Sequence, residues 1–432
     1  MSAISLRSYL KNERLLSPAR LHELQRVAEQ AARNGLPTYV VGGFVRDLLL
    51  ERAVNDFDIV IEGDAISFAH LLAKTYGGKV TAHKKFGTAK WWPGVDENPA
   101  SFLDLITARS ETYSSPAALP AVKFSALSDD ILRRDFTINT LAMRLDSDHF
   151  GELRDDLNGR SDLENGLIRV LHPGSFMDDP TRIYRAVRYE QRYGFEIEPD
   201  TLSLISAARL VIEKLPAQRI RHELDLMLGE RTSIFMLARL AELDLLKSIH
   251  PALPSDIPNY SKLYQPDTVE PELWGIATSL DENGFFGPSR ELLWLLWLAP
   301  LSKTELESVN IRLAFTADLM KSLLSASSLL QSVDSLVGSR PSEWVTRLDA
   351  ATLPAIAAAH LLSANIQVQD AISAYLKTWR HIKPATTGAD LKKRGLASGP
   401  KYHEILSRLR AAWLDGDVKN NQQEINLLER LL

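Results

Sequence analysis

Two aspartates, Asp56 and Asp58, follow a glycine-rich turn and have the spacing of paired metal ligands. Alternate residues of a strand point to one face, so Asp56 and Asp58 are expected to present two carboxylates side by side. Two such charges repel each other unless cations lie between them, and hard oxygen ligands suit Mg²⁺. The pair therefore predicts two-metal phosphoryl or nucleotidyl transfer, with Asp56 and Asp58 as the metal ligands. The alternative is an acidic strand end after an ordinary turn.

The turn before the aspartates contains Gly42 and Gly43, followed by a helix-like run at Val45–Leu50. Glycine has no Cβ, so the backbone N–H groups of such a turn can approach an anion closely, as in phosphate-binding nests. Arg46 lies in the same run and adds a cation. We therefore expect Gly42, Gly43 and Arg46 to hold the triphosphate of a nucleotide.

A sheet must position these groups, and the first third of the chain has the pattern of one. Short apolar runs alternate there with helical stretches, as a mixed sheet backed by helices requires. The strands are expected at Thr38–Val41, Phe57–Ile61, Lys79–Thr81, Thr88–Trp92 and Phe102–Ala108, with a helix at Ala65–Tyr76. From Ser175 onward apolar residues recur at helical spacing over Pro180–Tyr193, Thr201–Ala208, Ile220–Leu228, Ser289–Leu298 and Ile405–Leu414. The predicted fold class is α+β, with a small mixed sheet followed by helices.

A third acidic residue, Asp104, lies in the strand expected at Phe102–Ala108. A neighbouring strand would bring it close to Asp56 and Asp58, and an ordinary solvated strand residue is the alternative.

A second polar block begins with Arg133, Arg134 and Asp135, which we place at the start of a helix, and it ends at Asn139. An aspartate there can accept a hydrogen bond from a ribose hydroxyl, and the arginines match triphosphate oxygens in a bidentate geometry. The alternative is a helix N-terminus at which the dipole stabilises Asp135 and the arginines are solvated.

Asp179 and Arg182 have the spacing of residues on one helix face, so their side chains should project together. Cytosine and adenine each present an exocyclic amine beside a ring-nitrogen acceptor, whereas uracil and guanine present a carbonyl beside an N–H. An Asp/Arg pair complements the first two bases and mismatches the others. The alternative is an exposed helical ion pair, which contributes less than about 1 kcal/mol.

The order of these blocks resembles one family. Gly42-Gly43-x-x-Arg46-Asp47 with Asp56-x-Asp58 is similar to the nucleotidyltransferase superfamily that includes DNA polymerase beta. Residues 133–139 (RRDFTIN), 178–182 (DDPTR) and 219–224 (RIRHEL) narrow the resemblance to the class II tRNA nucleotidyltransferases, which include CCA-adding enzymes and bacterial poly(A) polymerases. The blocks cover roughly the first 230 residues, and the C-terminal half matches more weakly, mainly around Gly388–Tyr402.

The resemblance implies a nucleotidyltransferase head over residues 20–147, a base-recognising neck over 148–230, a helical body over 231–350 and a tRNA-binding helical tail over 351–432. It implies that Asp179 and Arg182 serve as a protein template. Family members usually have Glu where Asp178 stands here. Members that add only the final A have similar sequences around Ser175–Arg182, which leaves the product open.

The resemblance also implies that Arg134 and Asp135, in the block that ends at Asn139, select ribonucleotides. Asp104 would help to bind metal or to activate the primer hydroxyl.

Three further segments carry expectations. Arg185, Arg188 and Arg192 follow Arg182 along one helix face and would meet nucleotide and RNA phosphates, unless they form a solvated face. The stretch Arg109–Leu127 is too irregular for a strand and matches the family's flexible loop, with a plain connector as the alternative. Tyr375–Arg410 holds nine Lys or Arg against two acidic residues and would contact tRNA, a solvated helical face being the alternative.

The helical pair Arg219 and Glu223 has the i, i+4 spacing of a structural salt bridge.

Composition narrows the class further. The 432-residue chain has no cysteine, which excludes disulfides and thiolate metal sites and favours a cytoplasmic enzyme. No run of some 18 apolar residues predicts a membrane span. The net charge of −5 argues against a uniformly basic surface, so RNA contacts must come from local patches.

The resulting hypothesis is an Mg²⁺-dependent enzyme that adds C and A to tRNA 3′ ends from CTP and ATP without a nucleic-acid template. Within the class, the alternatives are an A-adding enzyme that completes CC ends and a poly(A) polymerase. From other classes, the alternatives are a non-catalytic RNA-binding protein on the same fold and a small-molecule nucleotidyltransferase. The intact Asp56 and Asp58 argue against the first of these, and the long helical half with a basic tail argues against the second.

Overall fold

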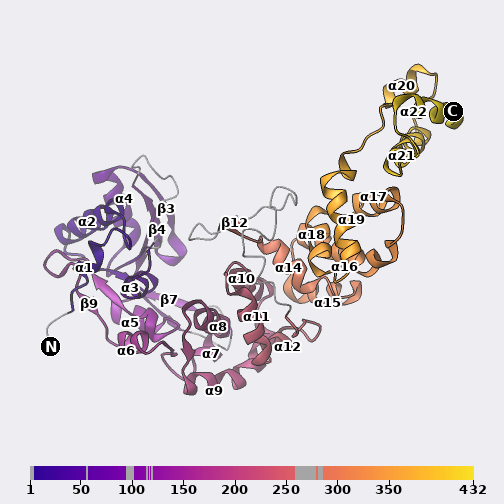
Figure 1. The fold of residues 1–432 in the computed structure, drawn as a ribbon. Coiled ribbons are helices and arrows are strands. Elements are labelled where there is room, and N and C mark those ends of the chain that lie inside the picture. The colour runs from indigo at the N-terminus through magenta and orange to yellow at the C-terminus, as the bar shows by residue number, and fades with distance from the viewer. Residues whose placement is uncertain are drawn as a thin grey trace. The chain divides into compact units, whose positions relative to one another are not determined.

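The structure is a computed structural model, and it describes residues 4–54, 57–93, 102–112, 115, 117, 120–257, 279–280 and 286–432. The chain forms two compact units, Met1–Leu215 and Pro216–Leu432 (Figure 1). The first contains a sheet with helices, and the second consists mainly of helices. The predicted α+β class is therefore confirmed. The division into head, neck, body and tail at residues 147, 230 and 350 stays a prediction.

A seven-stranded sheet forms the centre of the first unit, with the strand order β3-β4-β5-β2-β1-β8-β9. The β2–β5 pair is parallel, and the other neighbouring strands are antiparallel. The strands are β1 (Thr38–Val41), β2 (Asp58–Ile61), β3 (Lys79–His83), β4 (Thr88–Trp92), β5 (Leu103–Thr107), β8 (Ala142–Arg144) and β9 (Leu153–Arg154). Five of them confirm the predicted strands. β8 and β9 were missed, and β9 extends the sheet beyond the head boundary expected at residue 147.

Helices cover the sheet from both faces. Asp64 caps α4 by accepting hydrogen bonds from the backbone N–H groups of Ile66 and Ser67, and α4 packs on β3, β4 and β5. Leu127 and Ile131 of α5 join the apolar cluster on the sheet. The helices of this unit are α1 (Arg7–Leu10), α2 (Pro18–Arg33), α3 (Gly43–Leu49), α4 (Ala65–Tyr76), α5 (Leu127–Leu132), α6 (Gly159–Glu164), α7 (Ser175–Asp178), α8 (Thr181–Tyr193) and α9 (Pro199–Ala208).

The stretch expected to be too irregular for a strand instead contains a hairpin. β6 (Arg109–Thr112) pairs antiparallel with β7 (Ala121–Phe124) in a separate two-stranded sheet. None of their residues is buried and most are polar or exposed, so they lack the apolar alternation by which buried strands are recognised. Pro120 stands just outside the paired residues, where its missing N–H costs no ladder hydrogen bond.

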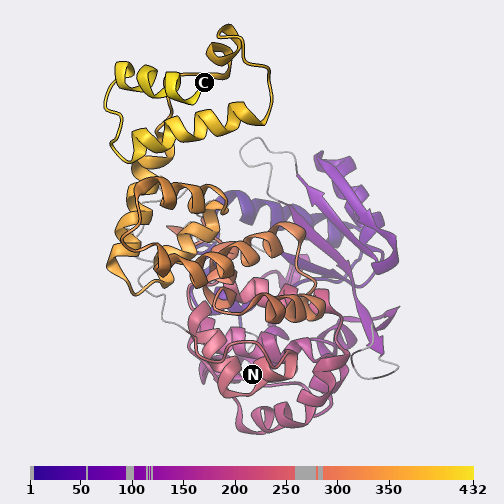
Figure 2. The same ribbon diagram turned by 90° about the vertical axis from the view of Figure 1, so that its right-hand side faces the viewer.

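The second unit is built from helices that pack in succession. Trp294 and Trp297 of α14 are buried in its core. The last three helices lie together at the C-terminal end (Figure 2), and Leu391, Leu409 and Leu428 join them in an apolar cluster of their own. Its helices are α10 (Ala217–Leu228), α11 (Ser233–Glu242), α12 (Leu245–Ile249), α14 (Arg290–Leu298), α15 (Lys303–Leu313), α16 (Ala317–Ser332), α17 (Pro341–Asp349), α18 (Leu353–Leu362), α19 (Ile366–Lys377), α20 (Gly388–Lys393), α21 (Pro400–Leu414) and α22 (Asn421–Leu431). Across the described ranges, no helix combines the length and apolar character needed to cross a bilayer.

Candidate active site

Asp58 and Asp104 are neighbours on two adjacent strands. Asp58 is the first residue of β2 and Asp104 the second of β5, and the two pair in register in the parallel ladder. Registered residues of neighbouring strands point to the same face, so these half-buried carboxylates project together. The predicted proximity of Asp104 to Asp58 is confirmed. Asp56 lies outside the described residues, so its part in the pair stays a prediction.

The donor set at this place fits Mg²⁺. Asp58 and Asp104 supply hard carboxylate oxygens, which this cation prefers. Lys90 of β4 lies 3.7 Å from Asp104 Oδ2 through its Nζ, so Asp104 already has a cation beside it. Among the residues that the structure describes, no group of three His, Asp or Glu is arranged to hold a metal ion. Asp58 has the chemistry of a metal ligand and Asp104, with Lys90 beside it, that of a supporting acid, and both roles stay predictions.

The glycine turn lies at the same end of the sheet. β1 runs antiparallel to β2, with Val40 opposite Ile59, so the turn after β1 reaches the Asp58 end of β2. Gly42 has φ +68°, and a Cβ there would lie 2.6 Å from Nη1 of Arg134. Only glycine allows this conformation together with such a close approach. The turn thus brings the Arg134 guanidinium against the backbone beside Asp58.

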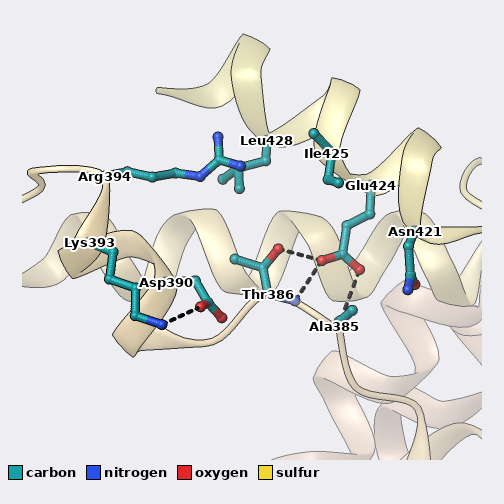
Figure 3. Close-up of a pocket in the computed structure, with 9 residues that line it drawn as sticks. All are labelled: Ala385, Thr386, Asp390, Lys393, Arg394, Asn421, Glu424, Ile425 and Leu428. Atoms are coloured by element: carbon teal, nitrogen blue, oxygen red, sulfur yellow. Dashed lines mark hydrogen bonds and ion pairs between the residues drawn. The ribbon is translucent and has the colours of Figure 1, made fainter.

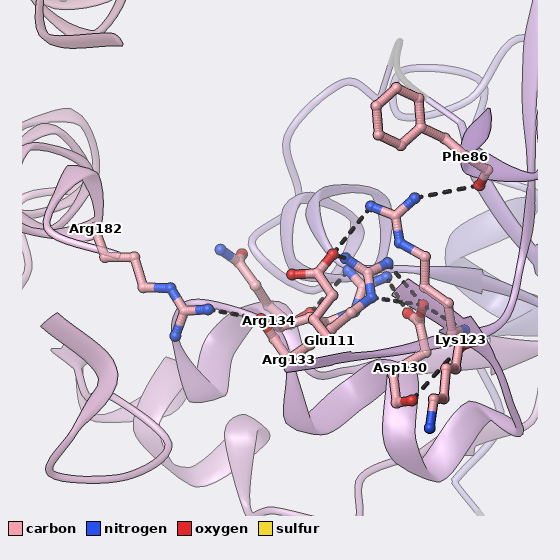
Figure 4. Close-up of polar contacts among 10 residues, drawn as sticks. Phe86, Glu111, Lys123, Asp130, Arg133, Arg134 and Arg182 are labelled. Carbon is pink, nitrogen blue, oxygen red and sulfur yellow. Dashed lines mark hydrogen bonds and ion pairs between the residues drawn. The ribbon is translucent and has the colours of Figure 1, made fainter. Parts of the chain in front are cut away.

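Arg133 and Arg134 are held by the buried carboxylate of Asp130 (Figure 4). Arg133 Nη2 and Arg134 Nη2 donate to its two oxygens at 2.7 and 3.1 Å, and Arg133 Nη1 lies 3.3 Å from Glu111 Oε1 on the hairpin. The expectation that Arg133–Asp135 opens a helix is wrong. These residues follow the end of α5, where their guanidiniums can turn back to Asp130 on the last turns of that helix.

Arg46 is buried, with 5 % of its surface exposed. Its Nη1 donates to Asn139 Oδ1 at 2.5 Å, and its Nε and Nη2 donate to the Asp47 carboxylate at 2.9 and 3.0 Å. The rings of Tyr189 and Tyr193 lie 5.2 and 4.7 Å from the guanidinium carbon. Burial works to lower the pKa of Arg46, but Tyr193 and Asp47 outweigh it, and the pKa is raised. The triphosphate role stays a prediction, and these contacts favour a bracing role.

Asp135 sits at the centre of a buried polar cluster. Its Oδ1 accepts from Asn139 Nδ2 and from the Phe136 backbone N–H, both at 2.9 Å, and its Oδ2 lies 2.7 Å from Arg185 Nη2. Burial alone would raise the pKa of Asp135, but Arg185 and the hydrogen bond from Asn139 outweigh it and lower the pKa. Asp135 is therefore an oriented carboxylate anion next to the glycine turn and α8. Its predicted contact with a ribose stays a prediction.

Asp179 and Arg182 lie at the start of α8, but they do not share a helix face as expected. Asp179 is extended (φ −137°, ψ 95°) between α7 and α8, because the residue before a proline, here Pro180, is driven out of the helical region. Its Oδ1 accepts from the backbone N–H and the hydroxyl of Thr181 at 3.0 and 2.6 Å. Arg182 is 4 % exposed and donates to Ser175 Oγ at 2.6 Å and to the Arg133 carbonyl at 2.9 Å (Figure 4).

The remaining arginines of α8 contact partners within the same unit. Arg185 pairs with Asp135, and the guanidinium carbons of Arg188 and Arg192 lie 5.5 and 5.7 Å from the rings of Tyr189 and Tyr193. Their predicted contact with phosphates stays a prediction. Arg219 and Glu223 both lie on α10, and their salt bridge also stays a prediction.

Sequence reasoning missed the residues that orient these groups. Asp130 could have been found, because it precedes Arg133 and Arg134 by three and four residues, the spacing of helical ion pairs. Ser175 carries no comparable signal, since its contact with Arg182 joins two different helices.

The tail contains one well-defined polar site. Glu424 is 1 % exposed and accepts hydrogen bonds from the backbone N–H groups of Ala385 and Thr386 at 2.9 and 2.7 Å, and from Trp413 Nε1 at 2.5 Å. These contacts fasten the segment before α20 to α21 and α22. Around them lies a pocket whose rim includes Lys393 and Arg394 (Figure 3).

Two family models match parts of the chain. The model of the "Poly A polymerase head domain" matches residues 38–169, and that of the "Probable RNA and SrmB- binding site of polymerase A" matches residues 194–256. An A-adding tRNA nucleotidyltransferase of Geobacter sulfurreducens is 35% identical over 98% of this chain, which spans only 48% of that protein. The protein of the same name from Halalkalibacterium halodurans is 32% identical over 94% of this chain and 91% of its own length.

Solved structures agree in fold. A CCA-adding enzyme in apo form II has a TM-score of 0.82 at 29% identity, and the Thermotoga maritima CCA-adding enzyme complexed with tRNA has 0.77 at 27%, each covering 100% of both chains. A CCA-adding enzyme has also been solved in complex with ATP, with a TM-score of 0.79 at 27% identity over 100% of both chains, and in complex with CTP, with 0.77 at 26% over 100% of this chain and 98% of that one.

Proposed function

The chain belongs to the family of tRNA nucleotidyltransferases and bacterial poly(A) polymerases, and on that premise we propose that it transfers nucleotides to the 3′ end of tRNA, with ATP as the donor for the terminal A. The observation that carries the proposal is the registered pair of Asp58 and Asp104 beside the glycine turn and Arg134. Nucleotidyl transfer requires acidic residues, a turn whose backbone a phosphate can approach, and a guanidinium held in place, all at one end of the sheet.

The acids would hold Mg²⁺. Asp58, together with Asp56, would supply its oxygen ligands, and Asp104 would lie next to them, balanced by Lys90. When bound, the ion lowers the pKa of an attacking hydroxyl and neutralises charge on the transferred phosphate.

The turn and its guanidinium would position the nucleotide. Gly42 and Gly43 leave the backbone accessible, and Arg134, fixed by Asp130, would add a charge to the triphosphate oxygens without having to be ordered first. Asp135, kept ionised by Arg185, would accept from a ribose hydroxyl. Ordering these groups before the substrate arrives lowers the entropic cost of reaching the in-line geometry.

Base choice would fall to Asp179 and Arg182. Ser175 and the Arg133 carbonyl each bind one end of the Arg182 guanidinium, which fixes its plane. Thr181 fixes one carboxylate oxygen of Asp179. A planar donor group and an oriented carboxylate match the amine and ring nitrogen of adenine and cytosine.

Two products remain candidates, and the relatives favour one. The two relatives compared above, at 35% and 32% identity, are both named for A addition, whereas a CCA-adding enzyme of Pediococcus pentosaceus is 25% identical over 93% of this chain. We therefore propose completion of CC ends with A, with synthesis of the whole CCA end as the second candidate.

In the test, the protein is incubated with tRNAs that end before the first C, that end after CC, or that are complete. Each reaction contains Mg²⁺ and one nucleoside triphosphate. A-adding activity predicts extension of the CC-ended tRNA by one A and no use of CTP. Use of CTP on the shortest tRNA would support the second candidate. No extension of any primer would overturn nucleotidyl transfer to tRNA, and a long A tail on complete tRNA would identify a poly(A) polymerase instead.

A further inference from the structure

Two large aromatic side chains of the first unit are exposed to solvent, although neither takes part in the site described above. Phe86 ends the short 3₁₀ helix η1 (Lys84–Phe86) and is 48% exposed, and Phe124 ends β7 and is 65% exposed. Single exposed hydrophobic residues are common on protein surfaces. Two rings brought together from separate segments need a further reason.

Gly87 allows the Phe124 ring to lie against the backbone next to Phe86. It follows Phe86 directly and has φ +61°, and a Cβ there would lie 2.5 Å from Cε1 of Phe124. Glycine therefore allows the Phe124 ring to lie on the backbone while most of the ring still faces solvent. Arg109, the partner of Phe124 in the hairpin, also donates from Nη1 to the Phe86 carbonyl at 3.4 Å. In Figure 4 the Phe86 ring lies clear of this polar contact.

The surroundings of the rings are basic. Lys84 and Lys85 precede Phe86, and both side chains are exposed. Lys123 is also exposed, but as the strand neighbour of Phe124 it points to the opposite face of β7. The carboxylate of Glu111 in the same hairpin is already engaged, because it pairs with Arg109 and Arg133. This local positive charge contrasts with the net charge of −5 of the whole chain.

The backbone beside the rings is three strand residues away from the proposed catalytic acids, since Gly87 lies next to Thr107 at the end of β5. β4 begins immediately after Gly87 and carries Lys90, whose Nζ lies 3.7 Å from Asp104. Three residues of strand span about 10 Å. An RNA strand whose 3′ end lies at the acids would therefore have to extend about 10 Å to reach the backbone beside the rings.

From these observations we infer that Phe86 and Phe124, with Lys84 and Lys85, form an aromatic platform that binds the single-stranded 3′ end of the RNA. The choice of RNA rests on the proposed function. Bases stack on aromatic rings without regard to sequence, and lysines attract the phosphates between them. The platform would hold the unpaired end of the primer while its last hydroxyl reaches the acids.

The experiment measures binding of fluorescently labelled tRNA in two forms, one ending in its unpaired CC end and one trimmed to a blunt acceptor stem. Phe124→Ala should bind the CC-ended tRNA roughly tenfold more weakly than the unsubstituted protein, because one stacking surface is lost. Its affinity for the blunt tRNA should stay unchanged. Phe124→Trp should restore binding, and Phe235→Ala, which removes a 58% exposed ring from α11, is the matched control.

Phe124→Ala and Phe235→Ala each change an exposed side chain, so the fold should persist. Circular dichroism checks that it does. Equal loss on both tRNAs, or no loss on either, overturns the platform. Nucleotide incorporation is measured separately on the same samples. If Phe124→Ala loses CC-end binding and the unsubstituted protein extends no primer, the platform is supported and the proposed function is refuted. A protein that extends primers normally despite Phe124→Ala and Phe86→Ala refutes the platform alone.

Discussion

Arg46 donates from Nη1 to Asn139 Oδ1 at 2.5 Å, and Asn139 in turn donates from Nδ2 to Asp135 Oδ1 at 2.9 Å. A residue of the glycine-turn helix thus fixes, through one amide, the carboxylate proposed to meet the ribose. The amide has no alternative orientation, because its oxygen faces a cation and its nitrogen faces an anion.

Arg46→Gln should therefore reduce the selectivity for ribonucleotides over deoxyribonucleotides while leaving measurable activity. Loss of the charged donor leaves Asn139 free to rotate, and a buried hydrogen bond to a charged group contributes about 1.5–3 kcal/mol, or roughly tenfold to 150-fold in selectivity. The measurement is kcat/KM for ATP against dATP. Arg52→Gln, which removes an exposed guanidinium 4.8 Å from the same Tyr193 ring, serves as control. A variant with lower melting temperature but unchanged ATP/dATP ratio would show that Arg46 supports only the fold.

Asp58→Asn should reduce nucleotide incorporation by about a thousandfold or more, because the amide removes charge from the proposed metal site. The unfolding midpoint should change little, since Asp58 is half-buried at a strand end. Incorporation is followed over a Mg²⁺ titration, with the exposed Asp156→Asn as control. Wild-type turnover at every Mg²⁺ concentration would refute the assignment of Asp58.

Asp179→Asn should reduce discrimination against UTP and GTP by roughly tenfold to a hundredfold, because an acceptor is replaced by an amide that donates. Asparagine keeps an oxygen for Thr181, so the start of α8 should survive, which makes this substitution sharper than alanine. Single-nucleotide incorporation with each triphosphate gives the ratio, and Asp178→Asn is the neighbouring control. If the preference among the four triphosphates is unchanged, Asp179 only caps the start of α8.

Replacing Lys392, Lys393 and Arg394 together by Gln should weaken tRNA binding and flatten its salt dependence. All three side chains are exposed on or after α20, and each phosphate contact contributes close to one unit to the slope of log K against log salt. Affinity for ATP should not change. The measurement is a tRNA titration across a salt series, and an unchanged slope would mean that the tail contacts something other than phosphates.

The tail should also lose stability in acid. Burial works to raise the pKa of Glu424, but hydrogen bonds from Thr386 and Trp413 outweigh it and lower the pKa below the ordinary value of 4.5. A carboxyl whose pKa is lower in the folded state stabilises the fold above its unfolded pKa, and this contribution disappears as pH falls through the folded value. Glu424→Gln should therefore be less stable at neutral pH and lose part of the acid dependence. Chemical unfolding between pH 7 and pH 3 measures both.

Much of the site could be predicted from local pattern. The glycine pair, Asp58 and Asp104 lie in or next to short strands, and strand register alone was enough to bring the acids together. The predictions were wrong where a residue's contact partner is far away in the sequence, or where a neighbouring proline changes the backbone conformation. Pro180 removed Asp179 from the helix, and the hairpin β6–β7 was hidden by its polar composition. No sequence signal shows that Arg46 is buried against Tyr189 and Tyr193, because those rings come from a helix far along the chain.

The parallel pairing of β2 and β5 has a consequence for how the protein forms. Parallel neighbours cannot be joined by a tight turn, and the chain between Asp58 and Asp104 contains α4 and the β3–β4 hairpin. Closing such a connection costs chain entropy that local contacts do not, and contacts of high sequence separation form late. During synthesis, Asp58 and Asp104 therefore cannot become neighbours until β5 has emerged and joined the sheet. The proposed metal site would be completed only after α4 and the β3–β4 hairpin have been synthesised.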